Sequence, residues 1–320
     1  MLRCAALMPS GGQPEEELKA LLPASIAVRF EEMFPDLRSG RIKRRDRRRA
    51  EMLRKAEPVL QRALNPMEVV RFTTNGVRQL TWWLLTAGSM NPFANRTTLV
   101  LTDRRVLLIH TDSKQRPRMF ANQLPLERIR ATAGRNSYVF IRSGREQLMF
   151  HGVKRSEARQ LRGLLDSTAT KKGGWQNLCP RCFTATDGVP PACEKCGEEF
   201  KSAKKAALRS LIFPGLGDFY LGYRKYAMLE IIGATLLWAL FLSTLIPAVM
   251  AKGLEGALVA SPLLALLAFT HIGDALLTRA KAQTGLHSKD GTLPTGDAWP
   301  GAQSRQTEPG AQSRRTEPGA

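Results

Sequence analysis

The chain has 320 residues, with 48 Lys and Arg against 28 Asp and Glu, and a formal net charge of +20. This length leaves room for about two ordinary domains, and the positive charge favours anionic partners such as phospholipid headgroups or nucleic acid. Long uncharged stretches gather between residues 231 and 277, which argues against a single globular body. We therefore expect a soluble part followed by a membrane part.

The first 65 residues predict helices. Residues 1–37 favour a loose arm and a short helix, because their apolar positions show near-helical spacing broken by Pro23. Residues 38–65 predict a strongly basic helix, which we expect to contact an anionic surface near the membrane. A solvated helix face is the alternative. The residues assigned to this contact are Arg41, Lys43, Arg44, Arg45, Arg47, Arg48 and Arg49.

Residues 66–168 change to short runs of alternating polarity. Turn-forming pairs separate the runs, among them Asn75-Gly76 and Ser143-Gly144. The region ends in VKRSEARQLRGLLDS, whose apolar residues share one helix face. We expect a small antiparallel β-barrel or sandwich capped by a C-terminal amphipathic helix.

The order of these elements resembles a known family. TTLVLTDRRVLLIH, followed by LPLERIRAT and the helix at 153–166, is similar to the bacterial pleckstrin-homology-like (GRAM-like) family. The resemblance implies a binding module rather than an enzyme, with the Asp103-Arg104-Arg105 turn joining two apolar strands. We expect Arg104 and Arg105 to be exposed in that turn.

An apolar cluster at Trp82 and Trp83 interrupts this region and is too short to span a bilayer. Core packing is the expected role. A tryptophan-rich tip at the membrane interface is the alternative.

Residues 175–200 contain the spacing C-x2-C-x10-C-x2-C. Each C-x2-C turn directs two thiolates to one point, and two such turns complete a tetrahedral zinc shell with no open position. The sequence predicts a zinc ribbon with one structural Zn²⁺, although Phe183 stands where many ribbons place glycine. The predicted ligands are Cys179, Cys182, Cys193 and Cys196.

Residues 205–282 form the predicted transmembrane region. The 21-residue stretch 231–251 and the 18-residue stretch 256–273 carry no charge, and the first is long enough to cross a hydrocarbon core of about 30 Å. We expect a transmembrane helical hairpin with a short external loop near residues 252–255. The weaker segment before it predicts a re-entrant or interfacial element, or a third span.

The motif PGLGDFYLG, together with the later HIGDALL, resembles the small membrane family called the TM-two domain. A pairing of Asp218 or Asp274 with Arg209 or Arg224 is one expectation for the two acids, and exposure at the interface is the other. The motif residues are Pro214, Gly215, Gly217, Asp218, Tyr220, Gly222 and Asp274.

Lysines and arginines flank the predicted spans on the side of both chain ends, with only Lys252 between the spans. The positive-inside rule then places the soluble domains in the cytoplasm, with a multi-pass anchor in a bacterial cytoplasmic (inner) membrane. Residues 283–320 are polar, contain the repeat GAQSRQTEP and GAQSRRTEP, and predict a disordered tail.

The fold class expected is therefore a multidomain α+β membrane protein: a β-domain, a zinc ribbon and a membrane hairpin. The expected function is a non-enzymatic, membrane-anchored cytoplasmic adaptor or scaffold that binds a protein partner or anionic lipid. A membrane-tethered nucleic-acid-binding protein is the main alternative, and a transport accessory subunit is another.

Overall fold

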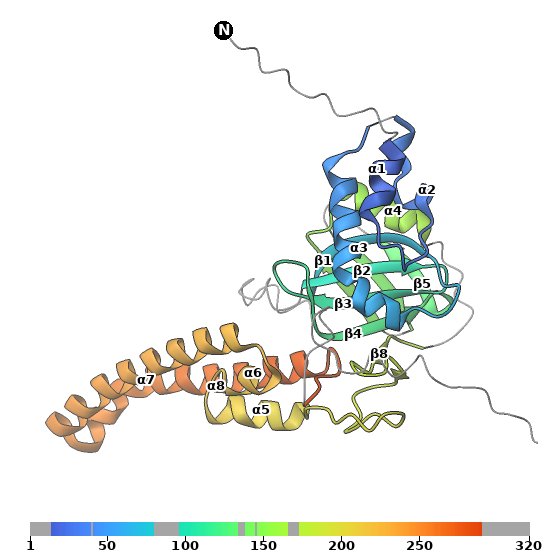
Figure 1. Cartoon of the computed structure of the whole chain (residues 1–320). Coiled ribbons are helices and arrows are strands. Elements are labelled where there is room, and N and C mark those ends of the chain that lie inside the picture. Colours follow the sequence, from blue (N-terminus) through green and yellow to red (C-terminus); the bar gives the residue numbers. More distant parts are fainter. Residues whose placement is uncertain are drawn as a thin grey trace, which may run out of the picture.

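The computed structural model describes residues 14–39, 41–79, 96–133, 138–144, 146–165 and 173–289. Within them the chain is a mixed α+β structure with an antiparallel sheet and a protruding C-terminal helical region (Figure 1). The helices are α1 (Pro14–Leu21), α2 (Phe30–Met33), α3 (Arg44–Ala63), α4 (Arg155–Leu164), α5 (Ala203–Ile212), α6 (Leu216–Leu221), α7 (Arg224–Lys252) and α8 (Ser261–Ala282). The strands are β1 (Val70–Gln79), β2 (Arg96–Thr102), β3 (Arg105–Thr111), β4 (Pro117–Pro125), β5 (Ile129–Ala133), β6 (Val139–Ser143), β7 (Glu146–His151), β8 (Gln176–Leu178) and β9 (Ala185–Thr186).

Two of the predictions fall outside this description. The Trp82-Trp83 cluster and the C-terminal repeat lie outside the described residues.

The nine strands form one sheet in the order β5-β6-β7-β1-β2-β3-β4-β8-β9, with every adjacent pair antiparallel. The predicted turn at Ser143-Gly144 is confirmed, since it joins β6 to β7 and Gly144 has φ of 59°. The predicted turn at Asn75-Gly76 is wrong, because both residues lie inside β1. A Cβ on Gly76 would lie 3.0 Å from Val153, so this glycine allows a close approach and does not form a turn.

Both faces of the central strands are covered, which explains why every residue of β3 is buried. One face, with β5 to β7 and α4, forms a core that includes Phe72, Phe150 and Leu161. The other face packs against α1 to α3, where Leu53 and Leu60 of α3 meet Ile109. The basic helix therefore has an apolar face that completes the second core. We call residues 70–165 the β-domain.

Arg105 is not exposed, contrary to the sequence expectation. Its guanidinium donates to the carboxylate of Glu68 at 2.9 and 2.7 Å, and also to the carbonyl of Ala63 at 2.5 Å. Burial alone would raise the pKa of Glu68, but hydrogen bonds from Arg105, the Asn65 N–H and Thr102 outweigh it and lower that pKa. The pair connects the end of α3 to the start of β3, and Arg104 remains exposed as expected.

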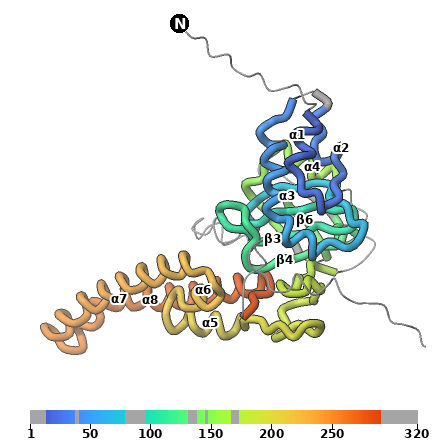
Figure 2. Tube along the Cα trace, in the orientation of Figure 1, coloured from blue at the N-terminus to red at the C-terminus, as the bar shows by residue number. Residues whose placement is uncertain are grey.

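The C-terminal helices form an antiparallel hairpin that extends away from the β-domain (Figure 2). The 3₁₀ segment Gly253–Ala260 joins α7 to α8, so the connection is longer than the predicted loop at residues 252–255. Its close packing depends on Gly256, whose missing Cβ faces the carbonyl of Ala248 at 1.9 Å. We call α7, this segment and α8 the apolar hairpin.

The base of the apolar hairpin is docked on the β-domain. Met119 and Phe120 of β4 share a buried cluster with Ala206 of α5, Leu221 of α6 and Ala282 of α8. Contacts among these four elements thus fix the base of the hairpin to β4.

Residues 283–289, here the terminal segment, were predicted to begin a disordered tail, and that boundary is wrong. Leu286 and His287 are buried, and the His287 carbonyl accepts a 2.8 Å hydrogen bond from the Lys201 N–H. Arg78 of β1 donates to the carbonyl of Thr284 at 3.2 Å. The polar composition of residues 283–320 gave no sign that this segment is ordered, because its order depends on contacts with residues far away in the sequence.

Candidate metal centre and apolar hairpin

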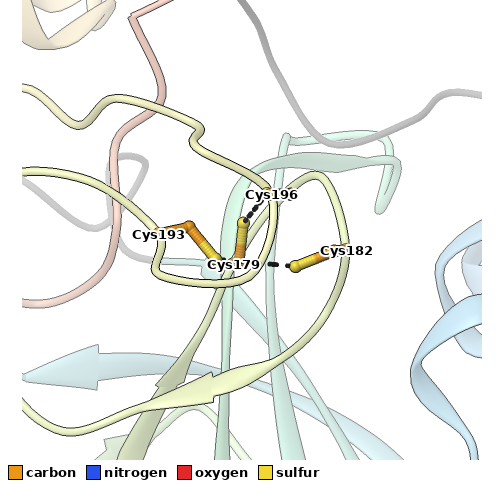
Figure 3. A group of neighbouring side chains, drawn as sticks. All are labelled: Cys179, Cys182, Cys193 and Cys196. Carbon is orange, nitrogen blue, oxygen red and sulfur yellow. Dashed lines mark hydrogen bonds between the residues drawn. The ribbon is translucent and has the colours of Figure 1, made fainter.

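The four predicted cysteine ligands converge in the structure (Figure 3). Their Sγ atoms all lie within 4.8 Å of one another, with Cys179 and Cys196 at 3.6 Å and Cys182 and Cys193 also at 3.6 Å. A tetrahedral ion with bonds of about 2.3 Å to sulfur places its ligands about 3.8 Å apart. The cluster could therefore bind a metal ion in an all-thiolate shell.

Two turns of the same design hold the cysteines. In the first, the Cys179 N–H donates to the Thr184 carbonyl and the Phe183 N–H donates to the Cys179 carbonyl. In the second, the Cys193 N–H donates to the Glu198 carbonyl and the Gly197 N–H donates to the Cys193 carbonyl. Because both turns close in the same way, each presents two thiols toward one point.

The environment of the thiols favours unequal ionisation. Burial raises the pKa of Cys179. Burial also opposes ionisation of Cys182, but hydrogen bonds from the Thr184 hydroxyl and N–H outweigh it and lower the pKa of Cys182 to about 7. A thiol with a lowered pKa is more readily present as the thiolate that binds a metal cation.

The cysteine module (residues 175–200) is continuous with the β-domain. Strand β8 pairs with β4, with Ala121 opposite Leu178, so the module extends the sheet. Phe183 has φ of 55°, a conformation that favours glycine, and its ring is buried in the core that α3 covers. Phe183 stands here in place of glycine because its buried ring anchors the cysteine module to the β-domain.

The apolar hairpin contains a helical segment, Arg224–Ala282, long and apolar enough to cross a membrane by length and composition. Only 11% of its most apolar 18-residue stretch is buried. Large side chains are exposed along its length, from Leu229 on α7 to Met250 near the tip and Phe269 on α8. Inside the hairpin, the Trp238 indole N–H donates to His271 Nε2 at 3.2 Å.

The glycines of PGLGDFYLG allow four helices to meet at the base of the hairpin. Gly215 follows Pro214 and has φ of 90°, and its missing Cβ faces the Ala227 carbonyl at 2.7 Å. A Cβ on Gly217 would lie 2.3 Å from the Ala206 carbonyl. Gly222 ends α6 with φ of 104°. Each position therefore excludes larger residues for a packing or conformational reason.

The two acids have partners that differ from the expected arginines. Asp218 forms a buried ion pair with Lys281 and accepts from Thr278 at 3.3 Å. Asp274 accepts from the Gly215 N–H at 2.8 Å. The expected pairing of these acids with Arg209 or Arg224 is wrong.

Tyr220 explains where Arg209 goes. Its ring lies 4.2 Å from the Arg209 guanidinium, and its hydroxyl accepts from the Ser202 N–H at 3.3 Å. The ring therefore connects the two ends of α5.

Lys281, the partner of Asp218, was not among the residues expected from the sequence. Residues 274, 278 and 281 follow the spacing i, i+4, i+7, so they share one face of α8. This spacing was the available signal, but the short distance to Asp218 depends on how α6 packs.

The basic residues at the start of α3 are divided between surface and interior. Arg45 pairs with Asp36, and Arg47 pairs with Glu17 at 2.7 Å. Arg49 is buried, donates to Gln160 at 2.9 Å and lies over the Phe72 ring. The other four, whose side chains are exposed or half-buried, are Arg41, Lys43, Arg44 and Arg48, of which Lys43 also pairs with Asp36 at 3.4 Å. The anionic contact of this helix stays a prediction, carried by fewer charges than the sequence contains.

Comparison of the chain with known protein families, with curated proteins and with solved structures gives no match. The geometry of the cysteine module and the apolar hairpin is therefore the basis for assigning a function.

Proposed function

We propose that the chain is a non-enzymatic membrane-anchored adaptor, in which the apolar hairpin crosses a bilayer and holds the β-domain and a zinc ribbon against its cytoplasmic surface. The exposed apolar surface of the hairpin is the observation that carries this proposal. At the middle of α7, Leu236 is 67% exposed, and at the turn Leu254 is 89% exposed. Exposure of this extent in water is unfavourable, whereas hydrocarbon is a suitable solvent for it.

The lengths of the helices agree with two spans. Helix α7 has 29 residues, which correspond to about 43 Å of helix, and α8 has 22, about 33 Å. Helix α5 has ten residues, about 15 Å, which is too short to cross. We therefore assign α5 and α6 to a re-entrant element beside the base of the hairpin.

The charges support one orientation. Lys204, Lys205, Arg224 and Arg279 are exposed near the base, while Lys252 lies at the far end of α7. Under the positive-inside rule the base faces the cytoplasm, on the side where the β-domain lies. A reducing cytoplasm also suits four thiolates that bind zinc.

Zinc in this module has a structural role. Four cysteine ligands leave no open position for a substrate, so the ion contributes folding free energy. Since β8 extends the sheet and the terminal segment pairs with residues 199–201, the ribbon connects the β-domain to the membrane anchor. The β-domain, with its antiparallel strands and closing helix α4, is the proposed pleckstrin-homology-like binding module.

Membrane fractionation of the full chain tests the proposal. The protein should stay in the pellet after alkaline carbonate and after 1 M salt, because a spanning hairpin is held by apolar contacts. A cysteine at the tip, Leu254→Cys, should react with an impermeant maleimide added outside intact cells. The matched variant Lys225→Cys should react only after permeabilisation. Release by carbonate, or equal labelling of both variants, would contradict the proposal.

A further inference from the structure

A cavity of about 690 Å³ lies where the cysteine module, α5 and α8 meet. Its wall includes Trp175 and Asn177 before and on β8, Ser202 and Lys204 at the start of α5, and Arg279 and Gln283 at the end of α8. The sequence does not predict this cavity, because its wall combines residues more than 100 positions apart.

The cavity has the chemistry of an anion site. Lys204 and Arg279 line the cavity, and none of the described residues that line it is Asp or Glu. Within the described part of the chain, neither cation forms an ion pair with a carboxylate. The first turn of α5 also contains no acidic residue, and the start of this helix adds a positive helix end to the same wall, with the Lys205 N–H capped by the Ser202 hydroxyl.

The surface next to the cavity is apolar on the same two helices. On α5, Leu208 and Leu211 follow Lys204 at i+4 and i+7 and are 57% and 46% exposed. On α8, Leu276 and Ile272 precede Arg279 by three and seven positions, and each is 54% exposed.

Helices α5 and α8 run side by side in opposite directions. The Ser210 hydroxyl lies 3.0 Å from that of Thr278, and the Leu211 carbonyl lies 2.9 Å from His271 Nδ1. The start of α5, with Lys204, therefore lies beside the end of α8, with Arg279. The exposed apolar side chains of both helices lie one to two turns further from these cationic ends. A cationic cavity bordered by an apolar strip has the shape and polarity of an amphiphile with a negative head.

We propose that this cavity binds the phosphate headgroup of an anionic phospholipid, with Lys204 and Arg279 on the phosphate and the acyl chains along the apolar strip of α5 and α8. The inference deepens the proposed function, on which it rests, because the cavity lies at the cytoplasmic end of the assigned spans. Guanidinium and ammonium groups bind phosphate through charge-assisted hydrogen bonds, which explains the pair of cations at the wall.

Lipid retention by the purified full chain tests the site. The protein is solubilised in a neutral detergent and titrated with phosphatidylglycerol or phosphatidylcholine, and bound lipid is counted by native mass spectrometry. The test variant is Lys204→Gln with Arg279→Gln. The matched control is Arg224→Gln with Lys225→Gln, which removes two cations from the same end of the hairpin but none from the cavity.

The wild type and the control should retain phosphatidylglycerol in preference to phosphatidylcholine. The test variant should bind phosphatidylglycerol about tenfold more weakly, since two charge-assisted contacts are lost. Equal affinity of all three proteins would overturn the site. Equally tight binding of glycerol 3-phosphate, which has the phosphate but no acyl chains, would assign the cavity to a soluble phosphate compound and overturn the lipid.

Carbonate extraction of the same proteins separates this test from the proposed function. Loss of lipid preference in a variant that stays in the membrane pellet concerns the cavity alone. Release of the wild type from the pellet would contradict the membrane anchor itself.

Discussion

Phe183 and Gly197 occupy equivalent positions in the two turns of the cysteine module, and both have left-handed backbone, with φ of 55° and 71°. Only Gly197 is the residue that this conformation favours. Phe183 is retained at a conformational cost because its ring is buried between the module and the β-domain.

The variant Phe183→Gly should lower the free energy of unfolding. Glycine relieves about 1 to 2 kcal/mol of backbone strain, but removing a buried aromatic ring costs about 3 to 5 kcal/mol. The expected net loss of about 2 to 3 kcal/mol is measured by thermal unfolding in detergent. The control Gly197→Ala, where a Cβ meets no atom within 4 Å, should lose only the strain energy. A Phe183→Gly variant as stable as the wild type would show that the ring is not an anchor.

The variant Cys193→Ser should lose zinc and unfold the cysteine module while the protein stays in the membrane. Three thiolates and a serine hydroxyl do not complete the shell, and a segment with so few apolar contacts depends on the metal to fold. Metal content by mass spectrometry, together with carbonate extraction, measures both outcomes. Cys4→Ser is the control and should keep one zinc per chain. Stoichiometric zinc in Cys193→Ser would refute the four-thiolate site.

Gly285 controls the docking of the terminal segment. A Cβ at this position would lie 2.2 Å from the Phe120 ring, so Gly285→Ala should displace residues 283–289 from β4. We expect faster amide hydrogen exchange at residues 284–289 and a Tm lower by several degrees. On the neighbouring helix α8, Gly273→Ala should have no such effect, because a Cβ there meets no atom within 4 Å. Unchanged exchange in Gly285→Ala would contradict the close contact.

Acid should also weaken the docking of the terminal segment, because that segment contains the buried His287. Burial and the neighbouring His110 lower the pKa of His287 to about 3 from 6.5, so the folded state holds this ring neutral. Below pH 6.5 the unfolded segment binds a proton that the folded one does not, and stability falls as pH falls. The loss amounts to about 2 kcal/mol at pH 5.

Unfolding measured from pH 7.5 to pH 5 tests this dependence. His287→Phe keeps an aromatic ring beside Phe120, which now lies 5.1 Å away between ring centres, and should flatten the profile. An equally steep profile in that variant would assign the acid sensitivity to other groups.

Asp218→Asn should destabilise the base of the apolar hairpin. The substitution leaves Lys281, which is 2% exposed, without its nearest anion, and breaking a buried ion pair costs about 3 to 5 kcal/mol. Glu230 lies 3.9 Å from the same ammonium and compensates in part. The readout is Tm and monodispersity in detergent.

The double variant Asp218→Leu with Lys281→Met serves as the companion test. It removes both charges together and should recover most of the loss. If the single variant is as stable as the wild type, the ion pair contributes nothing to the base.

Much of this protein could be predicted from local sequence patterns. The cysteine spacing determines the four-thiolate cluster, because each C-x2-C turn is a short-range structure. Period-two alternation determines most strands of the β-domain, and uncharged length determines the apolar hairpin.

The contacts between distant segments were decided only by the tertiary structure. Arg105 and Lys281 look like surface cations until Glu68 and Asp218 are brought beside them. Asn75-Gly76 has the composition of a turn, but it lies inside a strand, where the glycine leaves room for the side chain of Val153. Residues 283–289 are polar and short, and their order comes from Phe120 and the cysteine module. Burial of a polar or charged group is stable only with a partner. No local pattern predicts a partner that lies 37 residues away, as for Arg105, or 63 residues away, as for Lys281.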